Sequence, residues 1–416
     1  MERKPSQLTR QLGFIPTLMV ALGAMIGAGV YISMGEAAGT TGGSLLIAIL
    51  LGAGLATLNG LSSAQLGVYD PRAGGAYQFG RRLVSPVVGF MAGWLFLLAA
   101  LTAGATYVLT FSAYLQPLIP GIPPRVVGIV LVLLALVFNV RGVQLAARAN
   151  TALVFIKLAA LVLFVLLALP ALNLRIGLRP FIIGGIGGIL QATALLFFAY
   201  SGYARPVTIA EEVRNPSANL PRAVVLALGL TTILYLLVAL AGLGTLGPEG
   251  MGETDAPLRA AMEAAGSPLG ATLISLGALV ATSTVLITEI WGLSRLTFAM
   301  ARNGDLPTIF ARLTGPERVP RNAVLGAGLL LLLLISLADL RPALETSSLG
   351  LLIYYGVMNY SALRLPAQHR LYPPLVPVLG LVATLFVALS LPIQTVLGVA
   401  VVIVLGLGYY VLHQRL

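Results

Sequence analysis

The chain has 416 residues, of which 58% are hydrophobic and 9% are charged, and its formal net charge is +11. Soluble globular domains are about 45–50% apolar and about 25% charged, so this composition excludes a water-soluble domain. The chain has no cysteine and only two histidines, His369 and His413. Disulfides and thiolate chemistry are therefore excluded, and neither a histidine-based enzyme nor a metal site is expected.

Long apolar segments dominate the chain. A transmembrane helix needs about 20 mainly apolar residues. Twelve segments qualify, at 13–35, 43–68, 84–116, 123–140, 148–170, 184–212, 222–246, 268–301, 322–340, 344–364, 373–391 and 393–413. We therefore predict an all-α membrane protein with twelve transmembrane helices, preceded by a polar segment at residues 1–12.

The loops between these segments differ in charge. Lys4 and most of the arginines fall in the segments on the side of the two termini, whereas the alternate loops carry only a few arginines. By the positive-inside rule, both termini are expected to be cytoplasmic and the protein to lie in the inner (plasma) membrane. The net positive charge is thus interpreted as a topology signal and not as nucleic-acid binding. The long outer loop at 247–268 is expected to hold a short amphipathic helix.

Two of the predicted spans contain helix-breaking residues at membrane depth. The first has Gly23, Gly27 and Gly29 in its middle, and the sixth has Gly202 followed by Pro206. Interruptions at this depth are tolerated where they line a cavity, and matched breaks in two halves of a chain indicate a transporter site. Half-helix N-termini there face an anionic group and freed carbonyls face a cation, charges that a zwitterionic amino acid supplies. Alternatively, the glycines only permit close helix packing.

Several short passages, in order and spacing, resemble the amino acid–polyamine–organocation superfamily of permeases over nearly the whole chain. These passages are 27–31, 71–77, 197–203 with 211–216 and 221–222, 294–295 with 299–307, and Lys157. The resemblance implies a fold like that of the bacterial leucine transporter. In that fold, two inverted five-helix repeats, here 13–170 and 184–364, are followed by two additional helices, here 373–413. It also implies secondary transport of amino acids or related amines.

The resemblance also implies where a substrate would bind. The backbone near Ala28 and Gly29 would bind its carboxylate, and carbonyls of both breaks would bind its amino group. The expected substrate-binding residues are Met25, Ile26, Gly27, Ala28, Gly29, Phe198, Ala199, Ser201, Gly202 and Tyr203. The chain departs from the family at Tyr31, where many members have Phe, and at Ala204, where many have an acidic or polar residue. The second departure makes a cationic substrate less favoured.

Lys157 lies inside the fifth span, nine residues beyond Arg148 and so roughly 14 Å deeper in the membrane. A lysine there costs about 2.5–3.5 kcal/mol on the lenient insertion scale, and an apolar environment favours loss of its proton. Some members of the superfamily place a lysine at this point. Our hypothesis is that Lys157 is a proton-coupling site that replaces a sodium ion. The alternative is a snorkelling or structurally paired lysine.

Glu289 is an acid deep within the eighth span, six residues before Arg295. It could pair with Lys157, in which case the two groups would titrate together, or it could pair locally with Arg295 or cap a polar patch. Ser283 and Thr284 are candidates for an ion site or a polar lining. Such hydroxyls in membrane helices more often bond to their own backbone.

Together these features predict an amino acid permease that works by alternating access as a proton symporter. No enzymatic activity, cofactor or metal is expected, and the expected partners are an amino acid and membrane lipids, with the oligomeric state left open. The alternatives are an amino acid exchanger, a sodium-coupled carrier of the same fold or, less favoured, a polyamine or amine carrier. A channel would need rings of charge along a pore, which this sequence lacks.

Overall fold

The computed structural model describes residues 12–71, 75–141, 147–208, 210–315 and 318–413. Within these ranges the structure is helical, and the extended pairing is confined to two isolated bridges, Leu12 with Val213 and Thr314 with Val319. The all-α prediction is therefore confirmed for the part of the chain that is described.

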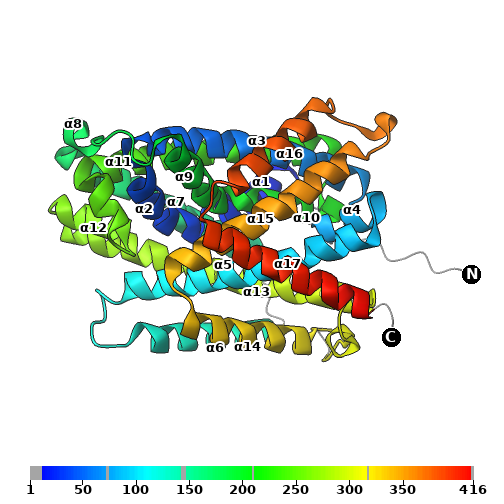
Figure 1. The fold of residues 1–416 in the computed structure, drawn as a ribbon. Coiled ribbons are helices and arrows are strands. Elements are labelled where there is room, and N and C mark those ends of the chain that lie inside the picture. The colour runs from blue at the N-terminus through cyan, green and yellow to red at the C-terminus, as the bar shows by residue number, and fades with distance from the viewer. Residues whose placement is uncertain (1–11, 72–74, 142–146, 209, 316–317, 414–416) are drawn as a thin grey trace, which may run out of the picture.

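The helices form a bundle in which the axes of most long helices are roughly aligned (Figure 1). In chain order, the α-helices are α1 (Phe14–Met25), α2 (Ala28–Thr41), α3 (Leu45–Tyr69), α4 (Gly75–Leu83), α5 (Pro86–Leu115), α6 (Pro124–Val140), α7 (Ala147–Ala168), α8 (Leu174–Gly177), α9 (Gly185–Tyr200), α10 (Arg205–Thr208), α11 (Pro216–Gly252), α12 (Pro257–Ala264), α13 (Pro268–Arg302), α14 (Arg321–Leu337), α15 (Leu340–Leu363), α16 (Leu375–Ala388) and α17 (Ile393–His413). The short 3₁₀ turns are η1 (Gly42–Ser44), η2 (Leu169–Ala171), η3 (Ser201–Ala204), η4 (Ala210–Glu212), η5 (Thr308–Ala311) and η6 (Ala367–His369).

Many of these helices are long and apolar enough to span a membrane. Among the described residues, 7 helical stretches meet both criteria, at 28–69, 86–115, 151–171, 185–207, 216–252, 268–302 and 393–413. Four apolar helices, α1, α6, α14 and α16, are shorter, at 10–17 residues. The first predicted span is divided between α1 and α2, which explains why α1 is short. The protein is an integral membrane protein, and the count of twelve spans stays a prediction.

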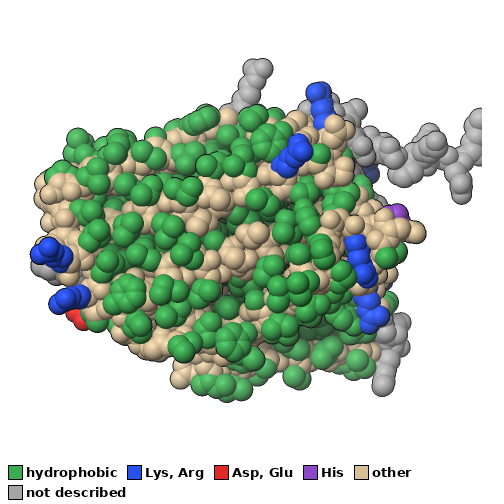
Figure 2. All heavy atoms as spheres, turned by 90° about the horizontal axis from the view of Figure 1, so that it is seen from above, with side chains coloured by type: hydrophobic (Ala, Val, Ile, Leu, Met, Phe, Trp, Pro, Cys, Tyr) green, Lys and Arg blue, Asp and Glu red, His purple; other side chains and the backbone are tan. Residues whose placement is uncertain are grey.

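The outer surface of the bundle suits a lipid environment. Figure 2 shows one face covered with hydrophobic side chains, with Lys and Arg gathered at its two ends. On α17, for example, Val404 and Leu412 are 67% and 66% exposed. Contact of these side chains with hydrocarbon in place of water removes the cost of exposing them.

Two groups of helices meet at the centre of the bundle. In one group α2 packs against α9 and α11, and in the other α5 packs against α13 and α15. The start of α1, helix α4 and the end of α17 lie at one end of the bundle, whereas α8 and α12 lie at the opposite end (Figure 1). We call these the terminal end and the opposite end. Helix α12, in the loop at 247–268, is the short helix that the sequence predicted there.

Candidate functional site

The first break separates α1 from α2. Ile26 has φ −83° and ψ 67°, and Gly27 has φ −115° and ψ −156°, so neither residue is helical. A Cβ on Gly27 would lie 2.9 Å from the Val285 Cγ2 atom of α13, which leaves little room for any other residue. Because α2 begins at Ala28, its first backbone N–H groups have no partner within the helix and point toward the break. Such a helix N-terminus favours an anionic group.

The second break follows α9, where the chain turns through η3 into the four-residue α10. The Ser201 hydroxyl donates a hydrogen bond of 2.8 Å to the Phe198 carbonyl at this turn. A Cβ on Gly202 would lie 2.5 Å from the Met25 nitrogen and 2.6 Å from the Ala24 oxygen. The two breaks are therefore in direct backbone contact, and glycine at position 202 allows it.

Tyrosine and serine hydroxyls contact the carbonyls that the resemblance assigned to the substrate amino group. The Tyr235 hydroxyl lies 2.7 Å from the Met25 oxygen and 3.1 Å from the Ala199 oxygen. The Tyr355 hydroxyl donates to the Ser201 oxygen at 3.0 Å, and Ser201 itself bonds to Phe198 as described above. A carbonyl oxygen has two lone pairs, so each can still accept a second hydrogen bond. An ammonium group would join or displace these hydroxyls.

A cavity lies beside the two breaks, with an empty volume of about 830 Å³ including its opening. Its walls come from both broken spans and from α5, α13 and α15. The lining residues are Ala24, Met25, Gly27, Ala28, Gly29, Phe96, Ala99, Ala100, Ala103, Tyr107, Phe198, Ala199, Ser201, Gly202, Ala204, Arg205, Val285, Thr288, Glu289, Leu351, Tyr354 and Tyr355. All of the expected substrate-binding residues line it except Ile26 and Tyr203, whose side chains are fully buried outside the lining.

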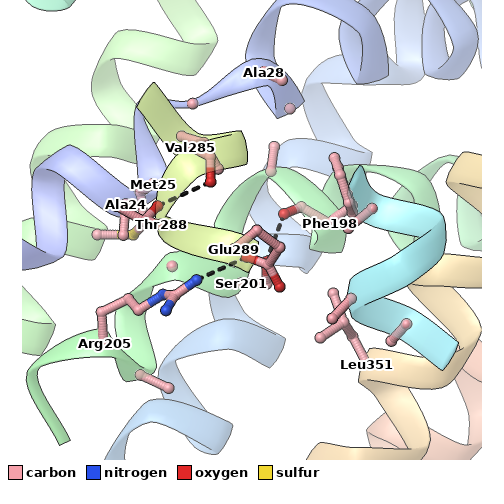
Figure 3. A pocket seen from close by; sticks show the side chains of 18 of the residues that line it. Ala24, Met25, Ala28, Phe198, Ser201, Arg205, Val285, Thr288, Glu289 and Leu351 are labelled. Atoms are coloured by element: carbon pink, nitrogen blue, oxygen red, sulfur yellow. Dashed lines mark hydrogen bonds and ion pairs between the residues drawn. The ribbon is translucent and has the colours of Figure 1, made fainter. Parts of the chain in front are cut away.

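Glu289 forms an ion pair at this cavity with Arg205, 2.7 Å apart (Figure 3). The expected alternatives, a pair with Lys157 or with Arg295, were both wrong, because Arg205 is the partner of Glu289. The Lys157 ammonium group instead contacts the Gly23 oxygen, and the Arg295 guanidinium lies over the Trp291 ring at 4.0 Å. The physical reason is the second break. Arg205 starts α10 directly after η3, and its side chain reaches Glu289 on α13.

Lys157 on α7 is buried, with 3% of its surface exposed, and does not line the cavity. Its ammonium group donates a hydrogen bond of 3.4 Å to the Gly23 oxygen, in the last turn of α1 before the first break. Carbonyls at a helix C-terminus carry partial negative charge, so this position favours a cation. Lys157 thus contacts the broken helix itself, and its role in proton coupling stays a prediction.

Ser283 and Thr284 also lie outside the lining of the cavity. The Ser283 hydroxyl donates to the Leu279 oxygen at 2.7 Å, and the Thr284 hydroxyl donates to the Val280 oxygen at 2.8 Å. Both bonds are local to α13. The same helix instead presents Thr288 to the cavity, which sequence reasoning missed. Across the described ranges, no group of three or more His, Cys, Asp or Glu side chains could hold a metal ion.

Comparison with known proteins identifies the family. The model of the family described as "Amino acid permease" matches residues 17–414, which includes both breaks and the cavity. The chain belongs to the amino acid permease family. The resemblance to the amino acid–polyamine–organocation superfamily is thereby confirmed.

Three relatives of this permease show how widely the family match extends. An uncharacterized transporter of Mycobacterium tuberculosis is 36% identical over 412 residues, covering 98% of this chain and 92% of the relative. The branched-chain amino acid permease BcaP of Bacillus subtilis is 26% identical over 436 residues, covering 98% and 94%. The cationic amino acid transporter 3 of Arabidopsis thaliana is 29% identical over 383 residues, covering 86% and 62%. The two named substrates differ in charge.

Proposed function

We propose that this permease carries an amino acid across the inner membrane by alternating access, as a proton symporter. One observation carries the proposal: two broken helices meet at one cavity with opposite polarity. The unpaired N–H groups at the start of α2 suit a carboxylate, and the carbonyls of Met25 and Ala199 suit an ammonium group. A zwitterion fits both, and names of relatives that include amino acids agree with this substrate class.

The same proposal includes the repeat architecture. The predicted repeats, 13–170 and 184–364, each begin with a broken span, α1 with α2 in one and α9 with α10 in the other. Residues 373–413 would add two further helices, and both termini would be cytoplasmic. The proposed orientation can be tested by labelling single cysteines, because the native chain has none. Gln368→Cys, at the terminal end, should react only from the cytoplasmic side, whereas Gly121→Cys should react only from outside.

Lys157 is the proposed proton-coupling residue. Its ammonium group contacts Gly23, next to the first break. Loss of the proton would weaken this contact and change the balance of forces on the end of α1. A protonated lysine would also repel a metal cation from this place, which favours a proton over sodium as the coupling ion.

The test is uptake of a panel of radiolabelled amino acids into proteoliposomes, with and without an inward proton gradient. The native protein should accumulate at least one amino acid only with the gradient. Lys157→Ala should lose accumulation and retain exchange, which also shows that the variant is folded. If accumulation is the same with and without the gradient, and the same in the native protein and in Lys157→Ala, the proton mechanism is replaced by an exchanger or a sodium-coupled carrier. Uptake of amines but of no amino acid would overturn the substrate class.

A further inference from the structure

The lining of the cavity contains one acidic and one basic side chain among the described residues. They are Glu289 and Arg205, joined at 2.7 Å. Figure 3 shows Arg205 and Glu289 reaching toward each other, from α10 and α13, at one side of the cavity. The formal charges of the lining side chains therefore cancel.

Both partners of this pair are largely removed from water. The Glu289 side chain is 11% exposed and the Arg205 side chain is 27% exposed. Breaking a buried ion pair by withdrawing one partner is strongly unfavourable, because the other charge is left without compensation. A lysine or arginine substrate that paired with Glu289 would compete with Arg205, and a glutamate substrate that paired with Arg205 would compete with Glu289.

In the described part of the lining, the other polar side chains are neutral hydroxyls and none carries a charge that could compensate a charged substrate. On the α5 side the cavity wall is formed by Phe96 and the three alanines Ala99, Ala100 and Ala103, and Val285 and Leu351 add further apolar surface. A charged substrate side chain placed against these residues would lose its hydration without gaining a partner. An uncharged side chain would gain from burial of its apolar surface.

We infer that the Arg205–Glu289 pair makes this permease selective for amino acids with uncharged side chains. The inference rests on the proposed function and adds the substrate class to it. It also distinguishes this chain within a family whose members are named for both branched-chain and cationic amino acids. The pair acts by mutual neutralisation, so removal of either partner should change which charge the cavity accepts.

The experiment measures uptake of lysine, glutamate and the best-transported uncharged amino acid from a panel of alanine, leucine, glutamine and phenylalanine. Proteoliposomes are held at zero membrane potential with potassium and valinomycin, so that substrate charge does not itself alter the driving force. The native protein should prefer the uncharged substrate over lysine and over glutamate by at least about tenfold.

Each single variant should change the preference in its own direction. Arg205→Gln leaves a net negative charge in the described lining of the cavity and should raise the ratio of lysine to uncharged uptake by at least about tenfold. Glu289→Gln leaves a net positive charge in that lining and should raise the ratio of glutamate to uncharged uptake. The double variant, with both substitutions, should return both ratios to within about threefold of native, because the cavity is again neutral.

A matched control removes a different ion pair from the same protein. Arg81 and Asp305 are 2.8 Å apart and do not line the cavity. Arg81→Gln should therefore leave the ratios of lysine and glutamate to uncharged uptake unchanged, even if the overall rate falls.

The outcomes separate the inference from the proposed function. Native protein that takes up lysine or glutamate at the same rate as the best uncharged amino acid would overturn the inference and leave amino acid transport standing. An unchanged ratio of lysine to uncharged uptake in a folded Arg205→Gln variant would also overturn it. If the variants do not fold, competition of lysine and glutamate against native uptake still decides the matter. Native protein that transports no amino acid would instead remove the proposed function.

Discussion

Tyr235→Phe removes a single hydroxyl from the centre of the molecule and keeps the shape of the side chain. Tyr235 is fully buried, and its hydroxyl contacts one carbonyl from each break, Met25 and Ala199. The hydroxyl has one proton and therefore donates to one carbonyl at a time. Loss of this bond leaves a buried carbonyl without its partner, at a cost of about 1–3 kcal/mol. The variant should be less thermostable than the native protein in detergent.

The same substitution should also weaken substrate binding. Without the hydroxyl, the two carbonyls are no longer held in one arrangement, so a bound amino acid must order them at the expense of its own affinity. We expect KM for uptake to rise several-fold, which corresponds to a loss of binding free energy no larger than about 1–3 kcal/mol, the cost of the lost hydrogen bond. The assay combines initial uptake rates in proteoliposomes with thermal unfolding followed by size-exclusion chromatography.

Tyr200→Phe is the matched control for this experiment. Its ring lies 5.1 Å from that of Tyr235, and its hydroxyl contacts Thr232 at 3.2 Å and the Ile49 oxygen at 3.4 Å, away from both breaks. It should leave KM unchanged. Equal KM and equal thermostability for Tyr235→Phe and native protein would refute the positioning role of this hydroxyl. Tighter binding in Tyr235→Phe would instead mean that the hydroxyl competes with the substrate ammonium group.

Three further tests, one of them with a control substitution, address individual contacts of the structure. Gly202→Ala should abolish most uptake, since the added methyl group would clash with backbone of the first break, whereas Gly187→Ala, which meets open space, should leave uptake intact; initial rates measure both. Ser283→Ala should retain native gradient-driven uptake, because its hydroxyl bonds within its own helix, and a loss of sodium or proton dependence would show that it lines an ion site after all. Asp305→Asn should lower thermal stability by an amount on the order of 1–3 kcal/mol, because the charged partner of Arg81 is lost; an unchanged melting temperature would contradict this.

The features predicted well from sequence are those that follow from local backbone chemistry. Gly27 and Gly202 mark the two breaks because glycine tolerates both non-helical conformations and backbone contact. Hydropathy located most helices for a similar reason, since spanning a bilayer requires a long apolar run. The short helix α12 also lies where amphipathic sequence predicted it.

The features that sequence reasoning missed depend on how distant helices are oriented. The partner of Glu289 is 84 positions away in the sequence, and the two meet only because α10 and α13 lie beside the same cavity. Tyr235 and Tyr355 lie in helices of otherwise ordinary apolar composition, and nothing in their spacing indicates that their hydroxyls contact the breaks. The alanine wall on α5 is likewise indistinguishable from tight helix packing until the cavity beside it is known.

The contact between Gly202 and Ala24 limits the kinds of movement that are open to the two broken spans. Because backbone lies against backbone here, with no room for a side chain at position 202, we expect sliding of one span along the other to be hindered and their relative motion to be a rotation about this contact. In such a rotation the contact would be the pivot, and displacement would grow with distance from it. A larger substrate would be accommodated by the walls farthest from the pivot, on α5 and α15, and substitutions there should alter the accepted size of a substrate more readily than substitutions at the breaks.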